Sequence, residues 1–236
     1  MSISQKKTAV RKKKEQLERR KSILAAAKEA FCLKGFMAAT MEEIADSCSL
    51  AKGTLYLYFK SKEDLYVSII LEGTSLLRKE LAKIANVSLP ADKLLGELLR
   101  SYLNFYENNR KYFRIMFLSS QPDTGDRVPD ELLKQCADQG IACMQVVSDV
   151  IEKGIESGIF RKVNPWTYAI VLWSAVNGIM MHYEQGGLYR DEILGPVPLH
   201  SMLQDALDLA LYGLMTTQPA TDFEPGSEEY SPCEHP

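Results

Sequence analysis

The residues Thr40–Lys62, TMEEIADSCSLAKGTLYLYFKSK, decide the fold that this sequence predicts. Thr40 stands three residues before Glu43, which is the spacing of a capping box and predicts the start of a short helix. After a tight break at Ser49-Leu50, a second short helix is predicted over Ala51–Tyr58. Two short helices joined by a tight turn, behind a longer supporting helix, are typical of a helix-turn-helix.

The second short helix carries side chains that suit a DNA duplex, because in a helix-turn-helix this helix enters the major groove while the first helix crosses the backbone. Lys52 places a cation near the phosphates, Gly53 lets the backbone approach closely, and Thr54 offers a hydroxyl or a methyl group to a base edge. Tyr56 and Tyr58 are long and rigid, and we expect their hydroxyls to reach phosphate oxygens.

Two more phosphate contacts are predicted beside this helix. Thr40 stands at a helix N-terminus, where its hydroxyl and the free N–H groups can hold a phosphate, although capping alone also explains this residue. Lys62, near the start of the next helix, is expected to reach another phosphate. For the tyrosines the alternative is that one of them is buried, beside the inward face that Leu55 and Phe59 define.

The rest of the chain is predicted to be helical, because its apolar residues recur every three or four positions and strand-like alternation is scarce. Gly35 is expected to end the first helix in a left-handed conformation. Outside the helix-turn-helix, helices are expected over 17–34, 61–85, 90–108, 110–119, 129–157, 165–185 and 198–217, with a loop over 121–128. The predicted fold class is therefore all-α.

Composition separates a basic end from an acidic remainder. The 236 residues are 46% apolar and 25% charged, which is ordinary for a globular chain and excludes wholesale disorder or a fibre. Residues 1–62 hold 14 Lys and Arg against 6 Asp and Glu, although the whole chain has a net charge of −3. A basic end predicts an anionic partner, either nucleic acid or an anionic membrane surface, unless it is only a solvated end. Residues 2–14 have almost no apolar face, which speaks against a membrane partner.

Neither a bilayer-spanning stretch nor a signal peptide is recognised, so a cytoplasmic location is expected. The five cysteines include no C-x-x-C pair, which speaks against a disulfide framework or a zinc site. Cys136 and Cys143 would share a helix face, as a redox pair or as two small buried apolar residues. No nucleophile–base arrangement or phosphate loop is recognised, so we expect no cofactor, no metal and no enzyme activity.

These motifs together carry a family resemblance. They are Gly35-Phe36, Thr40, Ile44-Ala45, Lys52-Gly53-Thr54-Leu55-Tyr56, Tyr58-Phe59 and Lys62-Glu63-Asp64-Leu65. The chain resembles the TetR family of bacterial transcriptional regulators from about Ile23 to Tyr66. Tyr58 departs from the family pattern, since many members have His there, and Leu50-Ala51 replaces a more usual turn. The resemblance implies DNA contacts at Thr40, Lys52, Gly53, Thr54, Tyr56, Tyr58 and Lys62.

Composition at the two ends and the resemblance between them imply a domain order and a second function. Residues 1–17 are expected to form a basic flexible arm that adds phosphate or minor-groove contacts, and 18–66 the DNA-binding domain. Residues 67–217 are expected to form a domain that binds an effector and dimerises, and 218–236 an acidic disordered tail. The implied function is a ligand-responsive homodimeric repressor on a palindromic operator, in which the effector moves the helix over 61–85. The alternative is a nucleoid-associated or cell-division protein that uses a protein partner and no small ligand.

Two helices are expected to form the dimer interface. Residues 165–185 are apolar around nearly the whole helix, and the small residues Ser174, Ala175 and Gly178 would let a partner helix approach. On the helix over 198–217, Leu203, Leu207, Leu211 and Leu214 repeat at four, four and three residues. A four-helix arrangement across a two-fold axis would bury both helices. The alternative is that they pack only within one chain.

An apolar or aromatic effector is expected, since Met and aromatic side chains make adaptable pocket walls. The candidate lining residues are Tyr102, Phe105, Tyr106, Met116, Phe117, Met144, Trp166, Trp173, Met180 and Met181. The alternative for each of them is an ordinary place in the core. Glu184 or Glu156 would select a cationic ligand, unless these acids are simply solvated.

Overall fold

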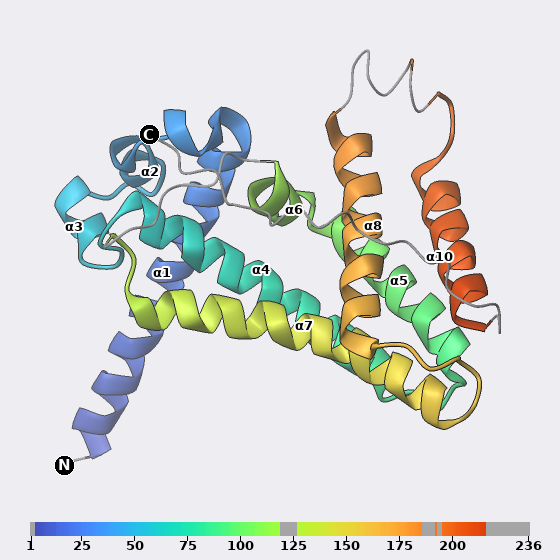
Figure 1. Ribbon diagram of the computed structural model, residues 1–236. Coiled ribbons are helices and arrows are strands. Elements are labelled where there is room, and N and C mark those ends of the chain that lie inside the picture. Colours follow the sequence, from blue (N-terminus) through green and yellow to red (C-terminus); the bar gives the residue numbers. More distant parts are fainter. Residues whose placement is uncertain (1–2, 119–126, 186–191, 193–194, 216–236) are drawn as a thin grey trace, which may run out of the picture.

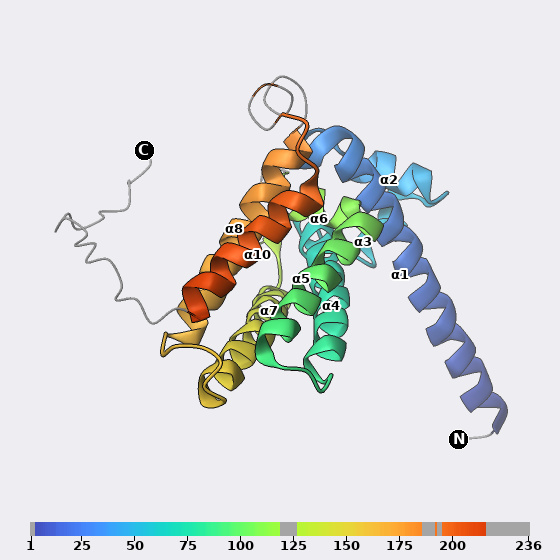
Figure 2. The same cartoon turned by 90° about the vertical axis from the view of Figure 1, so that its right-hand side faces the viewer.

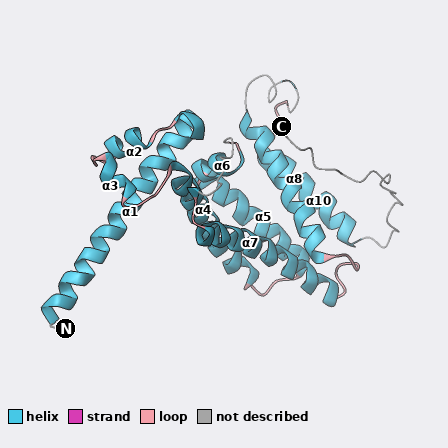
Figure 3. Cartoon of the chain, turned by 60° about the vertical axis from the view of Figure 1, so that its left-hand side comes forward, coloured by secondary structure: helices cyan, strands magenta, loops and turns pink. Residues whose placement is uncertain are grey.

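The computed structural model describes residues 3–118, 127–185, 192 and 195–215. Most of the predicted loop over 121–128 and the predicted acidic tail over 218–236 lie outside these residues. All regular structure in the described part is helical, so the all-α prediction is confirmed (Figure 3). In the same part of the chain, no helix is long and apolar enough to span a bilayer.

The helices form an elongated molecule with a small head at one end. Their bounds are α1 Ile3–Ala38, α2 Met41–Ser47, α3 Lys52–Tyr56, α4 Lys62–Ala85, α5 Ala91–Asn108, α6 Arg110–Phe117, α7 Asp130–Glu156, α8 Pro165–Gln185 and α10 Leu199–Met215. Helix α2 packs on α1 and α3 packs on α2, while α8 and α10 lie side by side at the opposite end (Figures 1 and 2). Helices α4 and α7 are packed along each other and connect the two ends.

Local chemistry explains where the head helices begin and end. The Thr40 hydroxyl accepts a hydrogen bond from the Glu43 amide at 3.2 Å, and the Glu43 carboxylate accepts one from the Thr40 amide at 3.4 Å, so the capping box is present. Gly35 has φ 76° and ψ 163°, which breaks the regular helix close to where the sequence predicts its end. Ser61 caps α4 by accepting from the Asp64 amide at 3.0 Å.

The N-terminal segment differs from the sequence prediction. Residues 1–17 were expected to form a flexible arm, whereas α1 is helical from Ile3 and leaves the body of the molecule as a projecting rod (Figure 1). The physical reason is that Lys, Arg, Glu and Gln are good helix formers even where nothing packs against them. The ion pair between Arg11 and Glu15, with 3.4 Å between nitrogen and oxygen, adds the favourable i,i+4 spacing.

Two apolar cores hold the described chain together. The head core contains Phe31, Ile44, Leu55 and Leu65, and it also takes in residues of α6 and of the segment before α7. Those additional residues are Tyr112, Ile115 and Val128, all at most 5% exposed. The body core joins α5, α7, α8 and α10 with the second half of α4. The head core therefore includes residues of α6 and of the segment before α7 as well as residues of α1–α4.

The leucine repeat of the last helix faces inward. Leu203, Leu207 and Leu214 are 1%, 9% and 0% exposed, and Leu211 packs against the same body core. These leucines are covered by α5 and α8 of the same chain, so they are not on the side of α10 that a partner subunit could contact, and the dimer interface through α8 and α10 stays a prediction. A repeat of three and four residues shows which side chains share a face but not what covers that face.

Candidate nucleic-acid interface and apolar cavity

The helix-turn-helix is held from beneath by its apolar residues. Leu55 and Phe59 are buried in the head core with Ile44 of α2. In the turn Ser49 has a positive φ of 54°, and the Leu50 amide donates to the Ala45 carbonyl at 2.9 Å. Helix α3 is shorter than predicted, since it ends at Tyr56 rather than Tyr58.

The opposite face of α3 points to solvent. Lys52, Gly53 and Tyr56 are exposed, and Thr54 is half-buried. Tyr58 is also half-buried and packs against the head core, while Tyr56 is 44% exposed. Four of the predicted DNA-contacting residues thus lie together on α3. Tyr58 lies after the end of α3 and contributes in part to the packing of the head core.

Gly53 is not required by the internal packing. A methyl group built on its Cα would meet nothing within 4 Å, and the residue has no positive φ. Glycine in a helix costs about 0.5–1 kcal/mol relative to alanine. The loss of helix stability at Gly53 is therefore not explained by packing within the chain. A molecule bound to this exposed position could approach the backbone more closely because the side chain is absent.

Charged groups around α3 are paired within the head. The Lys52 ammonium lies 3.4 Å from the Glu42 carboxylate, and both side chains are more than half exposed. Lys34 donates to Glu43 at 2.7 Å, and this contact is the main cause that holds the pKa of the Glu43 carboxyl below its ordinary value. Exposed pairs of this kind contribute little stability, so phosphates can compete for Lys52 at small cost.

Thr40 and Lys62 have different roles in the structure. Thr40 is exposed, so its capping role leaves room for a phosphate contact. The Lys62 ammonium instead donates to the carbonyls of Phe36 at 2.7 Å, Met37 at 3.2 Å and Ala39 at 3.0 Å. It also lies 4.4 Å from the centre of the Phe36 ring. Its three N–H groups are used within the head, which does not favour the predicted phosphate contact.

The projecting part of α1 adds basic surface beside the turn. Arg11, Lys14 and Arg19 line a groove together with Ser49 and Leu50 of the turn, although Glu15 and Glu18 lie in the same groove. Arg20 points the other way, over the Phe59 ring at 4.6 Å and toward the Ser68 hydroxyl at 3.3 Å. Arg20 therefore anchors the rod to the head, whereas the other cations remain at the surface.

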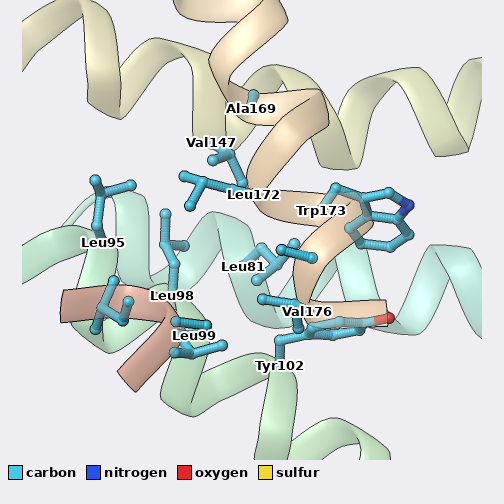
Figure 4. A pocket seen from close by; sticks show the side chains of 13 residues that line it. Leu81, Leu95, Leu98, Leu99, Tyr102, Val147, Ala169, Leu172, Trp173 and Val176 are labelled. Carbon is cyan, nitrogen blue, oxygen red and sulfur yellow. The ribbon is translucent and has the colours of Figure 1, made fainter. Parts of the chain in front are cut away.

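An apolar cavity lies in the body between α5, α8 and α10. Its free volume is about 80 Å³, and Figure 4 shows its wall of aliphatic side chains with Tyr102 and Trp173. Its lining residues are Leu81, Leu95, Leu98, Leu99, Tyr102, Val147, Ala169, Leu172, Trp173, Ala175, Val176, Ala206 and Leu207. None of them is charged.

Only two of the ten predicted lining residues, Tyr102 and Trp173, line this cavity. Phe105, Tyr106 and Met180 are buried in the body core, and Phe117, Met144 and Met181 pack against it. Met116 packs against the head core instead, and Trp166 is half-buried outside the lining. The prediction missed the leucines of α5 because it weighed Met and aromatic residues and gave no weight to aliphatic ones.

Two buried polar groups lie near the cavity. The Tyr102 hydroxyl donates to the Asn177 side-chain oxygen at 2.7 Å, and the Asn177 amide donates to the Trp173 carbonyl at 2.8 Å. Burial raises the pKa of Tyr102 far above its ordinary value, so the hydroxyl stays neutral. The ring of Tyr102 stacks on Trp173 with 5.2 Å between centres. Because the polar groups of Tyr102 and Asn177 already have hydrogen-bond partners within the chain, an apolar ligand chain is the best match for the cavity.

A carboxylate ties the end of α8 to α5 and α6. Glu184, whose side chain is 2% exposed, accepts hydrogen bonds from Tyr106, from Arg110 at 2.8 Å and from Arg114 at 3.2 Å. The pKa of Glu184 is lowered, because these hydrogen bonds and the nearby guanidinium charges outweigh the cost of burial. Burial and the carboxylate raise the pKa of Tyr106 to about 12. Glu184 is therefore satisfied internally, and the sequence-based alternative that it selects a cationic ligand finds no support here.

A helix-turn-helix head with one outward recognition face, on a helical body that contains an apolar cavity, defines a DNA-binding transcriptional regulator. Residues 23–69 match the sequence model described as "Bacterial regulatory proteins, tetR family". The head of the chain therefore carries a DNA-binding domain of the TetR family of bacterial transcriptional regulators.

Similar proteins are also described as transcriptional regulators. The uncharacterized HTH-type transcriptional regulator YhgD of Bacillus subtilis is 24% identical over 169 residues, which is 72% of this chain and 86% of YhgD. The HTH-type transcriptional activator FasR of Mycolicibacterium smegmatis is 28% identical over 161 residues, 67% of this chain and 71% of FasR. The transcriptional regulator FadR from Bacillus subtilis, solved in complex with stearoyl-CoA, has a TM-score of 0.67 at 18% identity, over 82% of this chain and 98% of FadR. At that identity the structural likeness concerns the fold alone.

Proposed function

We propose that this regulator is a homodimeric, ligand-responsive repressor that binds a palindromic operator. The observation that carries the proposal is the outward face of α3, where Lys52, Gly53, Thr54 and Tyr56 lie opposite the buried Leu55. A helix of this length reads few base pairs, so a two-fold pair of heads is needed for a specific site. A repressor acts when this site overlaps a promoter, and repression is the commoner role in the family.

An uncovered apolar stripe supports the homodimer. On α8, Ile170 and Val171 are 43% and 57% exposed, and the small residues Ser174 and Ala175 are exposed on the same face. On α10, the residues that point away from the body core include Leu209, Tyr212 and Met215, which are 74%, 65% and 54% exposed. Contiguous exposed apolar surface commonly marks an interface. A two-fold axis beside α8 and α10 would cover both helices at once.

The cavity supports an effector with an aliphatic chain. Its wall consists mainly of leucine, valine and alanine, with Tyr102 and Trp173 on one side, so a hydrocarbon would gain by leaving water. The related FadR binds stearoyl-CoA, which makes an acyl compound the first class to test. A polar headgroup would have to lie toward the opening, because the lining carries no charged side chain.

Helix α4 is the proposed connection between effector and operator. Leu81, near its C-terminal end, lines the cavity, while Leu65, near its N-terminal end, is buried in the head core. An effector that fits the cavity better in one position of α4 would change the separation of the two recognition helices, since a ligand acts only through unequal affinity for two states. We therefore propose 18–66 as the DNA-binding part and 67–217 as the effector and dimer part, acting in the cytoplasm.

The test is a selection of bound duplexes from random DNA with the full-length protein, followed by binding measurements with and without stearoyl-CoA and palmitate. The expected result is one palindromic sequence, a particle of twice 26.6 kDa, and weaker binding when a probe is present. Binding at many unrelated sites with no effect of either probe would instead favour the nucleoid-associated alternative. A folded protein that selects no duplex would refute the proposal.

A further inference from the structure

Lys62 occupies a position where a cation is electrostatically unfavourable. It is the first residue of α4, and the N-terminus of a helix carries partial positive charge. The neighbouring residues of the first turn, Glu63 and Asp64, follow the usual preference for acids there. A lysine at this place needs a compensating partner, and the structure supplies one in backbone oxygens.

Those oxygens belong to residues 36–39, here called the connector, which comprise the end of α1 after its break at Gly35 and Ala39 before α2. This connector begins directly after the break at Gly35 and leads into the Thr40 cap of α2. The Lys62 ammonium donates to three of its carbonyls at 2.7–3.2 Å and lies over the Phe36 ring, so a single cation holds the chain that follows the break at Gly35. Unpaired carbonyls at the end of a helix require such partners.

The same end of α4 is also held from the body. The Ser61 hydroxyl donates to the Arg127 carbonyl at 2.8 Å, and the Arg127 guanidinium donates to the Glu63 carboxylate at 2.9 Å. The Glu63 side chain is 9% exposed, and its hydrogen bonds and Arg127 together lower the pKa of its carboxyl despite burial. Consecutive residues of α4 thus contact the body on one side and the start of the helix-turn-helix on the other.

We propose that Lys62 is a positioning residue that clamps the connector 36–39 to α4, so that α2 and α3 follow α4, and that it does not bind a phosphate. This inference rests on the proposed regulatory function for its consequence, although the clamp itself can be observed without DNA. It assigns Lys62 a role in orienting Thr40 and α3 and in passing the effector's movement to the head.

The first experiment is acetylation of the unmodified full-length protein, with the labelled lysines identified by mass spectrometry in the presence and absence of the selected duplex. Lys62 is expected to react slowly in both samples, because its ammonium is held by carbonyls. Lys52 is expected to react quickly alone and slowly with DNA, and the exposed Lys60 is the control for an unprotected side chain. Rapid labelling of Lys62 in the free protein, lost when DNA is added, would overturn the proposal.

The second experiment measures operator binding as salt rises, for Lys62→Met, Lys62→Arg and Lys52→Met. Loss of a phosphate contact lowers the log–log slope by about 0.9 per contact, hence by about 1.8 for a symmetric dimer. Lys52→Met is expected to show this change, whereas Lys62→Met should bind about tenfold more weakly with the slope unchanged. Lys62→Arg should not restore affinity, since a planar guanidinium fits a three-carbonyl cage poorly although it binds phosphate well.

A reduced slope for Lys62→Met, restored by Lys62→Arg, would overturn the clamp while leaving the regulator proposal intact. Absence of any duplex binding by the wild-type protein would refute the regulator proposal, and the acetylation rates of the free protein would still decide the clamp.

Discussion

Gly53→Ala should separate the stability of the protein from its affinity for DNA. Within the chain the added methyl group meets nothing within 4 Å, so no packing is lost. Alanine is the better helix former by about 0.5–1 kcal/mol, and for a chain of this size that gain corresponds to a melting temperature higher by about 1–4 °C. If the duplex backbone contacts the Gly53 Cα at about 4 Å, the new carbon would lie about 1.5 Å nearer and must push the duplex away.

The expected loss of affinity follows from that contact. A cost of about 1.4 kcal/mol at each half-site is tenfold, so a symmetric dimer should bind its operator about a hundredfold more weakly. Fluorescence anisotropy with the selected duplex measures the affinity, and thermal unfolding measures the stability. Gly140→Ala is the matched control, because Gly140 of α7 also has no atom within 4 Å of the added carbon.

Gly140→Ala should raise the melting temperature and leave operator binding unchanged. Wild-type affinity of the Gly53→Ala protein would show that no duplex backbone approaches Gly53, and the proposed docking of α3 would then be wrong.

Three more changes test the dimer, the polar contact at α8 and the cavity. Gly178→Ala adds a methyl group to open space within one chain, so it should not destabilise the monomer, but it should raise the dimer dissociation constant by about tenfold in sedimentation experiments; an unchanged constant would exclude close approach at this point. Glu184→Gln should lower the free energy of unfolding by about 1–3 kcal/mol at pH 7, because it removes a buried carboxylate that accepts three donors. The pKa of Glu184 is lowered in the folded state, so the stability that its carboxylate contributes is present above the ordinary value of 4.5 and is lost as pH falls through the folded pKa. The free energies of unfolding of the wild-type and variant proteins should therefore become equal in acid. A difference between them that stays constant down to about pH 2 would refute the carboxylate as its cause. Trp173→Ala removes a cavity wall that stacks on Tyr102, so it should weaken palmitate or stearoyl-CoA binding about tenfold in calorimetry while the salt slope of operator binding stays the same; undiminished probe affinity would place the effector elsewhere.

Features that depend on neighbouring residues were predictable from the sequence. The capping box of Thr40 and Glu43 and the positive φ of Gly35 involve only a few consecutive residues, and both are confirmed. Helix α8 begins at Pro165 as predicted, because proline starts a helix with a fixed φ. Local chemistry of this kind does not depend on how the rest of the chain packs.

Features that depend on distant residues could not be predicted in the same way. The carbonyls around Lys62 lie more than twenty residues earlier in the chain, and nothing in the local pattern distinguishes an ammonium that meets carbonyls from one that meets phosphates. The inward turn of Leu203 and Leu207 depends on α5 and α8 for the same reason. The cavity is formed by side chains from five helices, so the composition of one helix could not define its lining.

The make-up of the head core bears on how such regulators can be recombined. Tyr112, Ile115 and Val128 are buried among residues of α1–α4, and the Tyr66 hydroxyl donates to the Ile115 carbonyl at 3.0 Å. A chimera joined just after Tyr66 would remove these three side chains from the head core. The apolar residues of α1–α4 that they cover would then be exposed to solvent. A DNA-binding unit that can be exchanged between proteins would therefore have to include α6 and the beginning of α7 of this chain. The boundary suggested by residue order, just after Tyr66, thus differs from the boundary of the packed head core.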